Sequence, residues 1–235
     1  MPAINVTPEH RRQLAEDGAV KFEGMLNSTE LAACRKSYDW AMANPTKHGG
    51  IVYQNKGYYN DATTLGAENA AELLSEITPL VSDGPFADIC QQLWESPRVW
   101  FYDYELFRKL DGPGRTKSPF HQDTGYIGFM GKEITAFWIC FEHIPKSSCL
   151  EIVRGSHLDR MYDGTPFRGD DDTARMYGTN GTYELPRLPD VEAQRAAGDV
   201  EILSWDLKPG DVVAFHPNAL HGGGQASAAC PERNT

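Results

Sequence analysis

Residues 120–123 read Phe-His-Gln-Asp and follow a turn-rich segment that ends at Pro119. Side chains two positions apart in a β-strand project from the same face. His121 and Asp123 can therefore point together into the interior of a sheet or barrel, where one metal ion reaches both. The tetrapeptide predicts two ligands of a metal site, and the third ligand has to come from a distant part of the chain.

His221 is the expected third ligand, because it ends an apolar stretch and stands directly before three glycines, where the backbone is free to bend inward. Two imidazoles and one carboxylate on one face of an ion leave positions open for other ligands, which suits non-haem Fe(II). A structural zinc ion would have a closed set of four ligands. His216 is a weaker candidate. The alternative is that His121 and Asp123 form an ordinary polar pair in a turn after Pro119. The flanking sequence has to distinguish this interpretation from a metal site.

The chain divides into a helical part and a strand-rich part. Residues 7–97 contain amphipathic patterns with Thr7 and Asn27 as expected helix caps, whereas residues 98–235 contain short apolar and aromatic runs typical of strands. Residues 158–200 are polar, acidic and glycine-rich, which predicts a long surface excursion and a candidate lid. We expect an α+β, mainly β fold, built around an antiparallel sheet pair or barrel in a single domain.

The charge and composition of the chain limit the kinds of molecule that it is expected to bind. The 235 residues carry a formal net charge of -11, which argues against nucleic acid and anionic membranes as partners, because both need a positive surface. The N-terminus has no apolar segment of the secretory kind, and no run is long enough to span a membrane. The five cysteines form no close pairs. We expect a cytoplasmic protein that acts on a small molecule, with its oligomeric state open.

Four segments surround the expected ligands, and they read FHQDTGY (120–126), AFWICFEHI (136–144), LEIVRGSH (150–157) and PGDVVAFHPNALHGG (209–223). Together, at this spacing, they resemble the phytanoyl-CoA dioxygenase family of Fe(II)/2-oxoglutarate-dependent oxygenases. The resemblance implies a double-stranded β-helix, or cupin-like jelly roll, with N-terminal and flanking helices. It also implies that His121, Asp123 and His221 hold the iron and form the catalytic site.

The resemblance further implies Fe(II) as the cofactor, with 2-oxoglutarate and O2 as co-substrates. The implied reaction is hydroxylation of an unactivated C–H bond in a small molecule, with release of succinate and CO2. Related halogenases replace the carboxylate ligand with a small residue, so the presence of Asp123 favours hydroxylation. The alternative is a metal-binding jelly-roll protein without oxygenase activity, either an isomerase or lyase or a protein that binds a small ligand.

The same resemblance assigns three residues to the 2-oxoglutarate site. Arg233 has the spacing of the family's arginine that pairs with the distal carboxylate, a task that suits a planar guanidinium. Trp138 matches a tryptophan that lines this site in some members, and it is equally compatible with core packing. Lys109 matches a lysine that recurs on the preceding strand, although such a lysine is more often a solvated strand end.

The chain departs from the family pattern in two places. The family's arginine begins a final barrel strand, whereas this chain ends at Thr235. We therefore expect the last strand to be missing, or Arg233 to lie on a frayed tail. Gly223 stands where relatives often have a small hydroxyl residue, so we expect that contact with the co-substrate to be absent.

Overall fold

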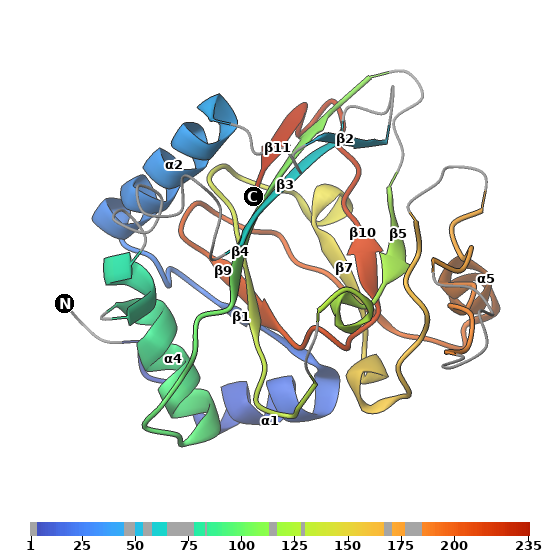
Figure 1. Cartoon of the computed structure of the whole chain (residues 1–235), viewed down its shortest axis with the longest axis horizontal. Coiled ribbons are helices and arrows are strands. Elements are labelled where there is room, and N and C mark those ends of the chain that lie inside the picture. Colours follow the sequence, from blue (N-terminus) through green and yellow to red (C-terminus); the bar gives the residue numbers. More distant parts are fainter. Residues whose placement is uncertain are drawn as a thin grey trace.

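A computed structural model gives the arrangement of the chain (Figure 1). The structure describes residues 4–44, 50–53, 58–64, 78–82, 84–112, 117–127, 130–166, 171–176 and 185–235. Among these residues, no helix combines the length and the apolar character that crossing a membrane requires. All five cysteines are buried free thiols.

The described α-helices lie mainly in the first part of the chain. They are α1 (Pro8–Asp17), α2 (Ser28–Ala43), α4 (Pro85–Trp94) and α5 (Val191–Ala197). The side chain of Thr7 accepts the N–H of His10 at the start of α1, and the side chain of Asn27 accepts the N–H groups of Thr29 and Glu30 at the start of α2. Both predicted caps are confirmed, and they fix where the two helices begin.

The strands form three antiparallel sheets, with the orders β1-β9-β6, β5-β10-β7-β8 and β11-β4-β3-β2. The strands are β1 (Ala19–Phe22), β2 (Gly50–Tyr53), β3 (Tyr58–Thr64), β4 (Asp103–Leu110), β5 (Ser118–His121), β6 (Ala136–Ile139), β7 (Leu150–Val153), β8 (Ile202–Leu203), β9 (Val212–Phe215), β10 (His221–Gly223) and β11 (Glu232–Asn234). Three short 3₁₀ helices connect them, namely η1 (Asp123–Gly125), η2 (Lys146–Ser148) and η3 (Ser156–Leu158). The sheets curl around a common interior, as in a jelly roll (Figure 1).

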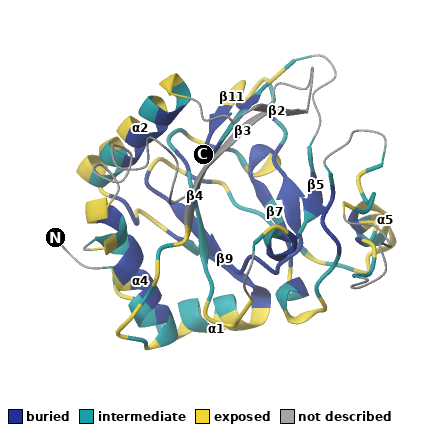
Figure 2. Ribbon diagram, viewed as in Figure 1, coloured by how far each residue is buried: buried dark blue, intermediate teal, exposed yellow. Residues whose placement is uncertain are grey.

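Strand β9 separates two cores, because its side chains alternate between the faces of the sheet. Val213 and Phe215 join an inner cluster that also contains Trp138 of β6 and Ile152 of β7. Val212 and Ala214, on the opposite face, pack in a second cluster against β1, α2 and α4. Figure 2 shows the buried strands at the centre and the exposed faces of the helices at the outside. The interior between the sheets is thus left for the inner cluster and the site.

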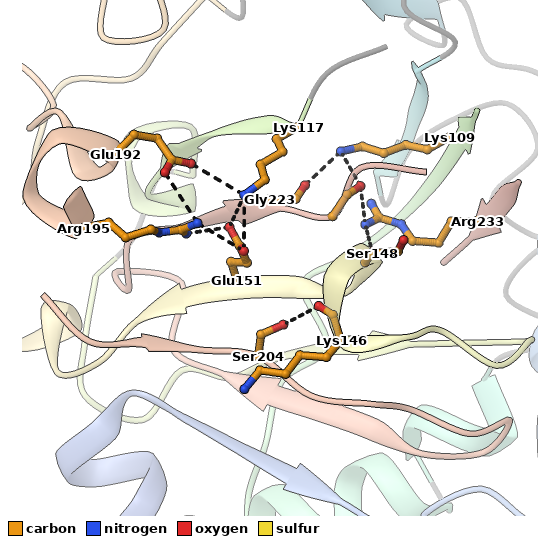
Figure 3. Close-up of polar contacts among 11 residues, drawn as sticks. Lys109, Lys117, Lys146, Ser148, Glu151, Glu192, Arg195, Ser204, Gly223 and Arg233 are labelled. Carbon is orange, nitrogen blue, oxygen red and sulfur yellow. Dashed lines mark hydrogen bonds and ion pairs between the residues drawn. The ribbon is translucent and has the colours of Figure 1, made fainter. Parts of the chain in front are cut away.

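Helix α5 covers the outer face of the sheet that contains β5, β10 and β7. Val191 of α5 packs with Phe120 and Val153 in a separate apolar cluster. Arg195 of α5 also bonds the carboxylate of Glu151 at 2.6 Å, in an ion cluster that Figure 3 shows. The last part of the predicted excursion is therefore anchored to the sheet.

The predicted division into a helical and a strand-rich part is only partly correct. Strands β1, β2 and β3 lie within residues 7–97. Strand β1 is only four residues long and sits directly between two helices, so its local pattern did not reveal it. Its pairing with β9, nearly two hundred positions later, is what makes it a strand. Residues 67–77, within the part predicted to be helical, lie outside the described residues.

Replacing Phe22 with alanine tests the layer between the helices and the sheet. The side chain of Phe22 is 1% exposed within the outer cluster, so we expect the free energy of unfolding to fall by about 3–5 kcal/mol. Trp100 provides the control, because its side chain is 93% exposed and its loss should change stability by less than about 0.5 kcal/mol. Denaturant titrations of the two variants should show this contrast; equal destabilisation would contradict the packing described here.

Candidate metal centre

Strand pairing brings the three predicted ligands together. His121 ends β5, His221 begins β10, and these two residues pair directly across the antiparallel ladder. Asp123 begins η1 immediately after β5. The Nε2 atoms of His121 and His221 lie 3.5 and 3.3 Å from Oδ1 of Asp123, and the ligand atoms all lie within 4.8 Å of one another. One ion at the centre of this group would touch all three residues.

Backbone carbonyls hold both imidazole rings in the orientation that a metal requires. The Nδ1 atom of His121 lies 2.9 Å from the carbonyl oxygen of Pro119, and that of His221 lies 2.9 Å from the carbonyl oxygen of Ala219. A carbonyl only accepts, so each Nδ1 carries the hydrogen and donates it. The lone pair is then on Nε2, which faces Asp123. Carbonyl contacts of this kind fix the tautomer of metal-binding histidines.

The charges in the group favour a bound cation. Burial alone would raise the pKa of Asp123, but the neighbouring His221 and His121 outweigh this effect and hold it below its usual range. Burial alone would lower the pKa of His221, but the carboxylate of Asp123 outweighs burial and raises it. Burial, reinforced by His221, lowers the pKa of His121. The ionised carboxylate therefore attracts a positive charge, which a proton on His221 or a metal ion can supply.

A network that the sequence did not reveal connects the two ligand-bearing segments. Gln122, between His121 and Asp123, is buried and points away from the ligands. Its amide nitrogen donates to the carbonyls of Asn218 (2.8 Å) and Arg160 (3.2 Å), and its amide oxygen accepts the N–H of Tyr162 (2.8 Å). The signal for Gln122 was present in the strand alternation, since a residue between two inward ligands must face the other side.

Asn218 completes this network from the His221 side. Its side-chain oxygen accepts the hydroxyl of Thr124 at 2.8 Å, and its nitrogen donates to the carbonyls of His157 and Asp159. The main chain adds a further link, because the N–H of Asp123 donates to the carbonyl of Pro217. The positions of Asp123 and His221 are thus fixed relative to each other by buried hydrogen bonds.

The other histidines that the sequence offered have different partners. His216 accepts the N–H of Asn218 on Nδ1, and its Nε2 contacts the carbonyl oxygen of Gly131. His157 contacts the carbonyl oxygen of Ala15, and the exposed His143 lies beside Asp206. Among the described residues, only the trio of His121, Asp123 and His221 forms a group able to hold a metal ion.

A pair of buried cations lies beyond the metal centre. Lys109 of β4 and Arg233 of β11 are direct partners in the strand pairing, and their side chains are both nearly inaccessible to solvent. The lysine ammonium contacts the carbonyl oxygens of Gly223 and Gly224 at 3.1 and 3.2 Å, as well as the Ser118 hydroxyl. Lys109 is therefore not a solvated strand end, because β4 turns this side chain into the interior.

Arg233 reaches the same point from the opposite direction. Its Nη1 atom donates to the carbonyls of Ser148 (3.0 Å) and Gly224 (2.8 Å), as Figure 3 shows. Its guanidinium carbon lies 5.2 Å from the centre of the Trp138 ring. Arg233 thus belongs to a paired, buried strand, and the expectation of a frayed tail is wrong. The pairing with β4 could not be inferred locally from three residues.

These two buried basic side chains are close enough for the charge of one to affect the other. Burial, reinforced by the charge of Arg233, holds the pKa of Lys109 well below its usual range. An anion between the two groups would oppose both effects. Gly223, whose carbonyl contacts Lys109, lies two residues after His221 on β10. Along the strand, the backbone at Gly223 is therefore about 7 Å from that at His221.

Gly223 has no room for the hydroxyl side chain found in relatives of the expected family. A Cβ atom there would lie 2.6 Å from Cγ of Glu151, and the backbone is left-handed with φ of 74°. The Glu151 carboxylate is held in place by Arg195 and by Lys117 (Figure 3). The hydroxyl group at this end of the pocket comes from Ser118 on the neighbouring strand instead.

The sequence model of the family described as phytanoyl-CoA dioxygenase (PhyH) matches residues 14–234. The chain belongs to this family. It is 22% identical to the peroxisomal phytanoyl-CoA dioxygenase of Homo sapiens over 236 residues, and 21% identical to that of Mus musculus over 232 residues. Each alignment covers 94% of this chain and 64% of the relative, so the chain spans a little under two thirds of these proteins.

Several solved structures share the fold. The carbocyclase SnoK from nogalamycin biosynthesis superposes with a TM-score of 0.66 at 20% identity, covering 98% of this chain and 81% of SnoK. EctD from S. alaskensis, solved with 2-oxoglutarate and 5-hydroxyectoine, superposes with a TM-score of 0.66 at 18% identity, covering 97% and 74%. The epimerase SnoN, solved with Fe3+, α-ketoglutarate and a nogalamycin, gives 0.66 at 18% identity, covering 96% and 79%. The predicted jelly roll with flanking helices is thereby confirmed.

Metal affinity should depend on pH through His221. Its pKa is raised above the ordinary histidine value of about 6.5, and a ligand must lose its proton to bind a metal. Affinity for a redox-stable substitute such as Co(II) should therefore decline as the pH falls through that raised pKa. Calorimetric titrations between about pH 6 and 8 should show proton release on binding; a constant affinity across this range would contradict the assignment.

Replacing Gln122 with leucine should loosen the metal centre without removing a ligand. The change leaves the N–H of Tyr162 and the carbonyl of Asn218 without their partner, so we expect a loss of about 2–4 kcal/mol in stability. We also expect a smaller rise in melting temperature on adding Co(II) than the wild type shows. Gln13 to leucine is the control, because Gln13 is a half-buried residue of α1 whose side chain bonds Glu9 at the surface. If Co(II) raises the melting temperature of the Gln122 variant as much as that of the wild type, the network does not support the metal site.

Proposed function

We propose that the chain is an Fe(II)/2-oxoglutarate-dependent dioxygenase that hydroxylates an unactivated C–H bond of a small molecule, with release of succinate and CO2. The observation that carries this proposal is the convergence of two Nε2 atoms, at 3.5 and 3.3 Å, on one carboxylate oxygen. Beside it, Lys109 and Arg233 are buried against the main-chain carbonyls that follow His221. A metal centre next to an anion site is what a dicarboxylic co-substrate requires.

The donor set fits iron. Two neutral imidazoles and one carboxylate on one side of an ion are the ligands typical of non-haem Fe(II) oxygenases, and they leave the other side open. The described residues near the trio offer no thiolate ligand, since all five cysteines are excluded from the group that could hold a metal. We assign the iron ligands to His121, Asp123 and His221 on these grounds.

The cation pocket fits the distal carboxylate of 2-oxoglutarate. A guanidinium can bind a carboxylate with two hydrogen bonds, so we assign this role to Arg233, with Lys109 and Ser118 beside it. The ring of Trp138 lies against the guanidinium of Arg233. Gly223, whose carbonyl contacts Lys109, stands about 7 Å along β10 from His221, a span that a five-carbon diacid can bridge.

The residues of the chain then have separate tasks during turnover. Iron, 2-oxoglutarate and O2 supply the oxidising power for attack on a C–H bond. The carbonyls of Pro119 and Ala219 keep the imidazoles oriented, and Gln122 and Asn218 keep the ligand segments in register. The aromatic ring of Phe215, whose centre lies 4.8 Å from that of His221, helps to keep water away from this ligand.

A different oxidative outcome is the second candidate, because two of the structural neighbours are named as a carbocyclase and an epimerase. Such reactions would use the same metal centre and the same co-substrate pocket. Product analysis separates the three: hydroxylation adds one oxygen atom to the substrate, cyclisation removes two hydrogens, and epimerisation leaves the mass unchanged.

The proposal is tested with His121→Ala, Arg233→Gln and, as a matched control, His143→Ala, which alters an exposed histidine outside the trio. Under anaerobic conditions, wild type and control with Fe(II) and 2-oxoglutarate should show a weak visible charge-transfer band, which His121→Ala should abolish. Arg233→Gln should raise the dissociation constant for 2-oxoglutarate about 10- to 100-fold, because a charge-assisted contact is lost.

Succinate release in the presence of a screened substrate should follow the same order among these variants. Absence of the band in metal-loaded wild type, together with turnover that does not depend on 2-oxoglutarate, would replace the proposal with the non-oxygenase alternative.

A further inference from the structure

Tyr126 ties the segment after η3 to the loop that carries Asp123. Its hydroxyl donates to the carbonyl of Thr165 at 2.9 Å and accepts the N–H of the same residue at 2.8 Å. Thr165 is fully buried, whereas Tyr126 follows η1 directly. One side chain therefore uses both of its hydrogen-bonding functions on the main chain of a single residue in the excursion.

The two segments cross with their backbones in contact. A Cβ atom on Gly125 would lie 3.3 Å from the nitrogen of Gly164, and one on Gly164 would lie 3.0 Å from Cε1 of Tyr126. The contact continues outward, because the N–H of Met176 donates to the carbonyl of Gly164 at 2.8 Å. A side chain at position 125 would crowd the backbone of Gly164, and one at position 164 would crowd the Tyr126 ring.

The same ring also borders the metal centre. Its centre lies 6.2 Å from that of the His121 ring, with the planes at 70°. Tyr126 is nevertheless 37% exposed. Since its hydroxyl is turned toward Thr165, what it presents to solvent beside His121 is the apolar surface of the ring.

We propose that Tyr126 is a positioning residue for the oxygenase reaction. Its two hydrogen bonds to Thr165, the tether, hold residues 162–165, the roof, beside the open side of the metal. The exposed surface of its ring contacts an apolar part of the substrate. This inference rests on the proposed function. The roof limits the access of water and O2 to the metal until substrate fills the space, so the tether couples consumption of 2-oxoglutarate to oxidation of the substrate.

The tether is separate from the bonds that fold this region. Gln122 already holds Arg160 and Tyr162, and Asn218 holds His157. Loss of the Tyr126 hydroxyl should therefore loosen Thr165 itself, while Asp163, whose N–H donates to the carbonyl of Pro186, stays attached. A purely structural role would instead lower stability and metal affinity together.

Tyr126→Phe is the decisive variant, because it keeps the ring and removes both bonds to Thr165. Thr165→Ser is the matched control, since Tyr126 bonds the main chain of residue 165 and the tether survives the change. Gly164→Ala tests the same contact independently. Its new methyl group would press on the Tyr126 ring, while the tyrosine hydroxyl remains.

Three measurements on full-length protein distinguish the roles. The first is hydrogen exchange of the Thr165 amide, observed by NMR. The second is the affinity for Fe(II) and 2-oxoglutarate, measured from the anaerobic charge-transfer band. The third is succinate release with Fe(II), 2-oxoglutarate, O2 and ascorbate but no added substrate, in which ascorbate supplies the electrons that substrate otherwise provides.

We expect Tyr126→Phe and Gly164→Ala to lower the protection of the Thr165 amide by about tenfold or more. Substrate-free succinate release should rise several-fold, with the affinity for Fe(II) and 2-oxoglutarate unchanged, and Thr165→Ser should behave like the wild type. With a substrate found by screening, both variants should raise KM and the ratio of 2-oxoglutarate consumed to product formed.

Unchanged amide protection in Tyr126→Phe would overturn the tether, and lost protection with unchanged substrate-free turnover would overturn its role in coupling. Parallel loss of stability and metal affinity would make Tyr126 a structural residue and overturn the proposal. If the wild type shows no charge-transfer band, the proposed function is wrong. The hydrogen-exchange measurement on Thr165 still tests the tether in that case.

Discussion

The direct pairing of His121 with His221 across β5 and β10 is the constraint on which the site depends. Because side chains alternate along a strand, a shift of one residue in this register would turn one imidazole to the outer face. Asp123 has to follow His121 by two positions, so its carboxylate is placed by the same register. The buried contacts of Gln122 and Asn218 support the pairing from the outer side, where a slip would leave polar groups unsatisfied.

Buried charge is the second theme of the structure, and it links stability to ligands. Asp123 at one end of the pocket and the pair of Lys109 and Arg233 at the other are charged groups removed from water, which is costly in the absence of a partner of opposite sign. A metal cation at the first and a dicarboxylate at the second would complement both. Each ligand should therefore stabilise the folded chain by mass action.

Local signals in the sequence were sufficient where a short range of residues decides the structure. The period-two spacing of His121 and Asp123 placed two ligands on one face, and the capping residue Asn27 located the start of α2. Strand β1 and the inward face of β4 could not be predicted in this way, because each is defined by pairing with a distant strand. Lys109 seemed a solvated strand end for this reason, and Arg233 seemed to lie on a free tail.

The triad and the cation pocket are coupled through one short strand, and its glycines explain how. Gly224 has φ of 66°, and a Cβ atom there would lie 1.7 Å from Nη1 of Arg233, so any side chain would expel the guanidinium. His221 stands three residues earlier, at the start of β10. The backbone that presents the imidazole to the metal therefore also leaves the space for Arg233 and offers it a carbonyl. A displacement of this strand would move metal ligand and anion site together, which is why we regard the two as a single site for a metal and a dicarboxylate.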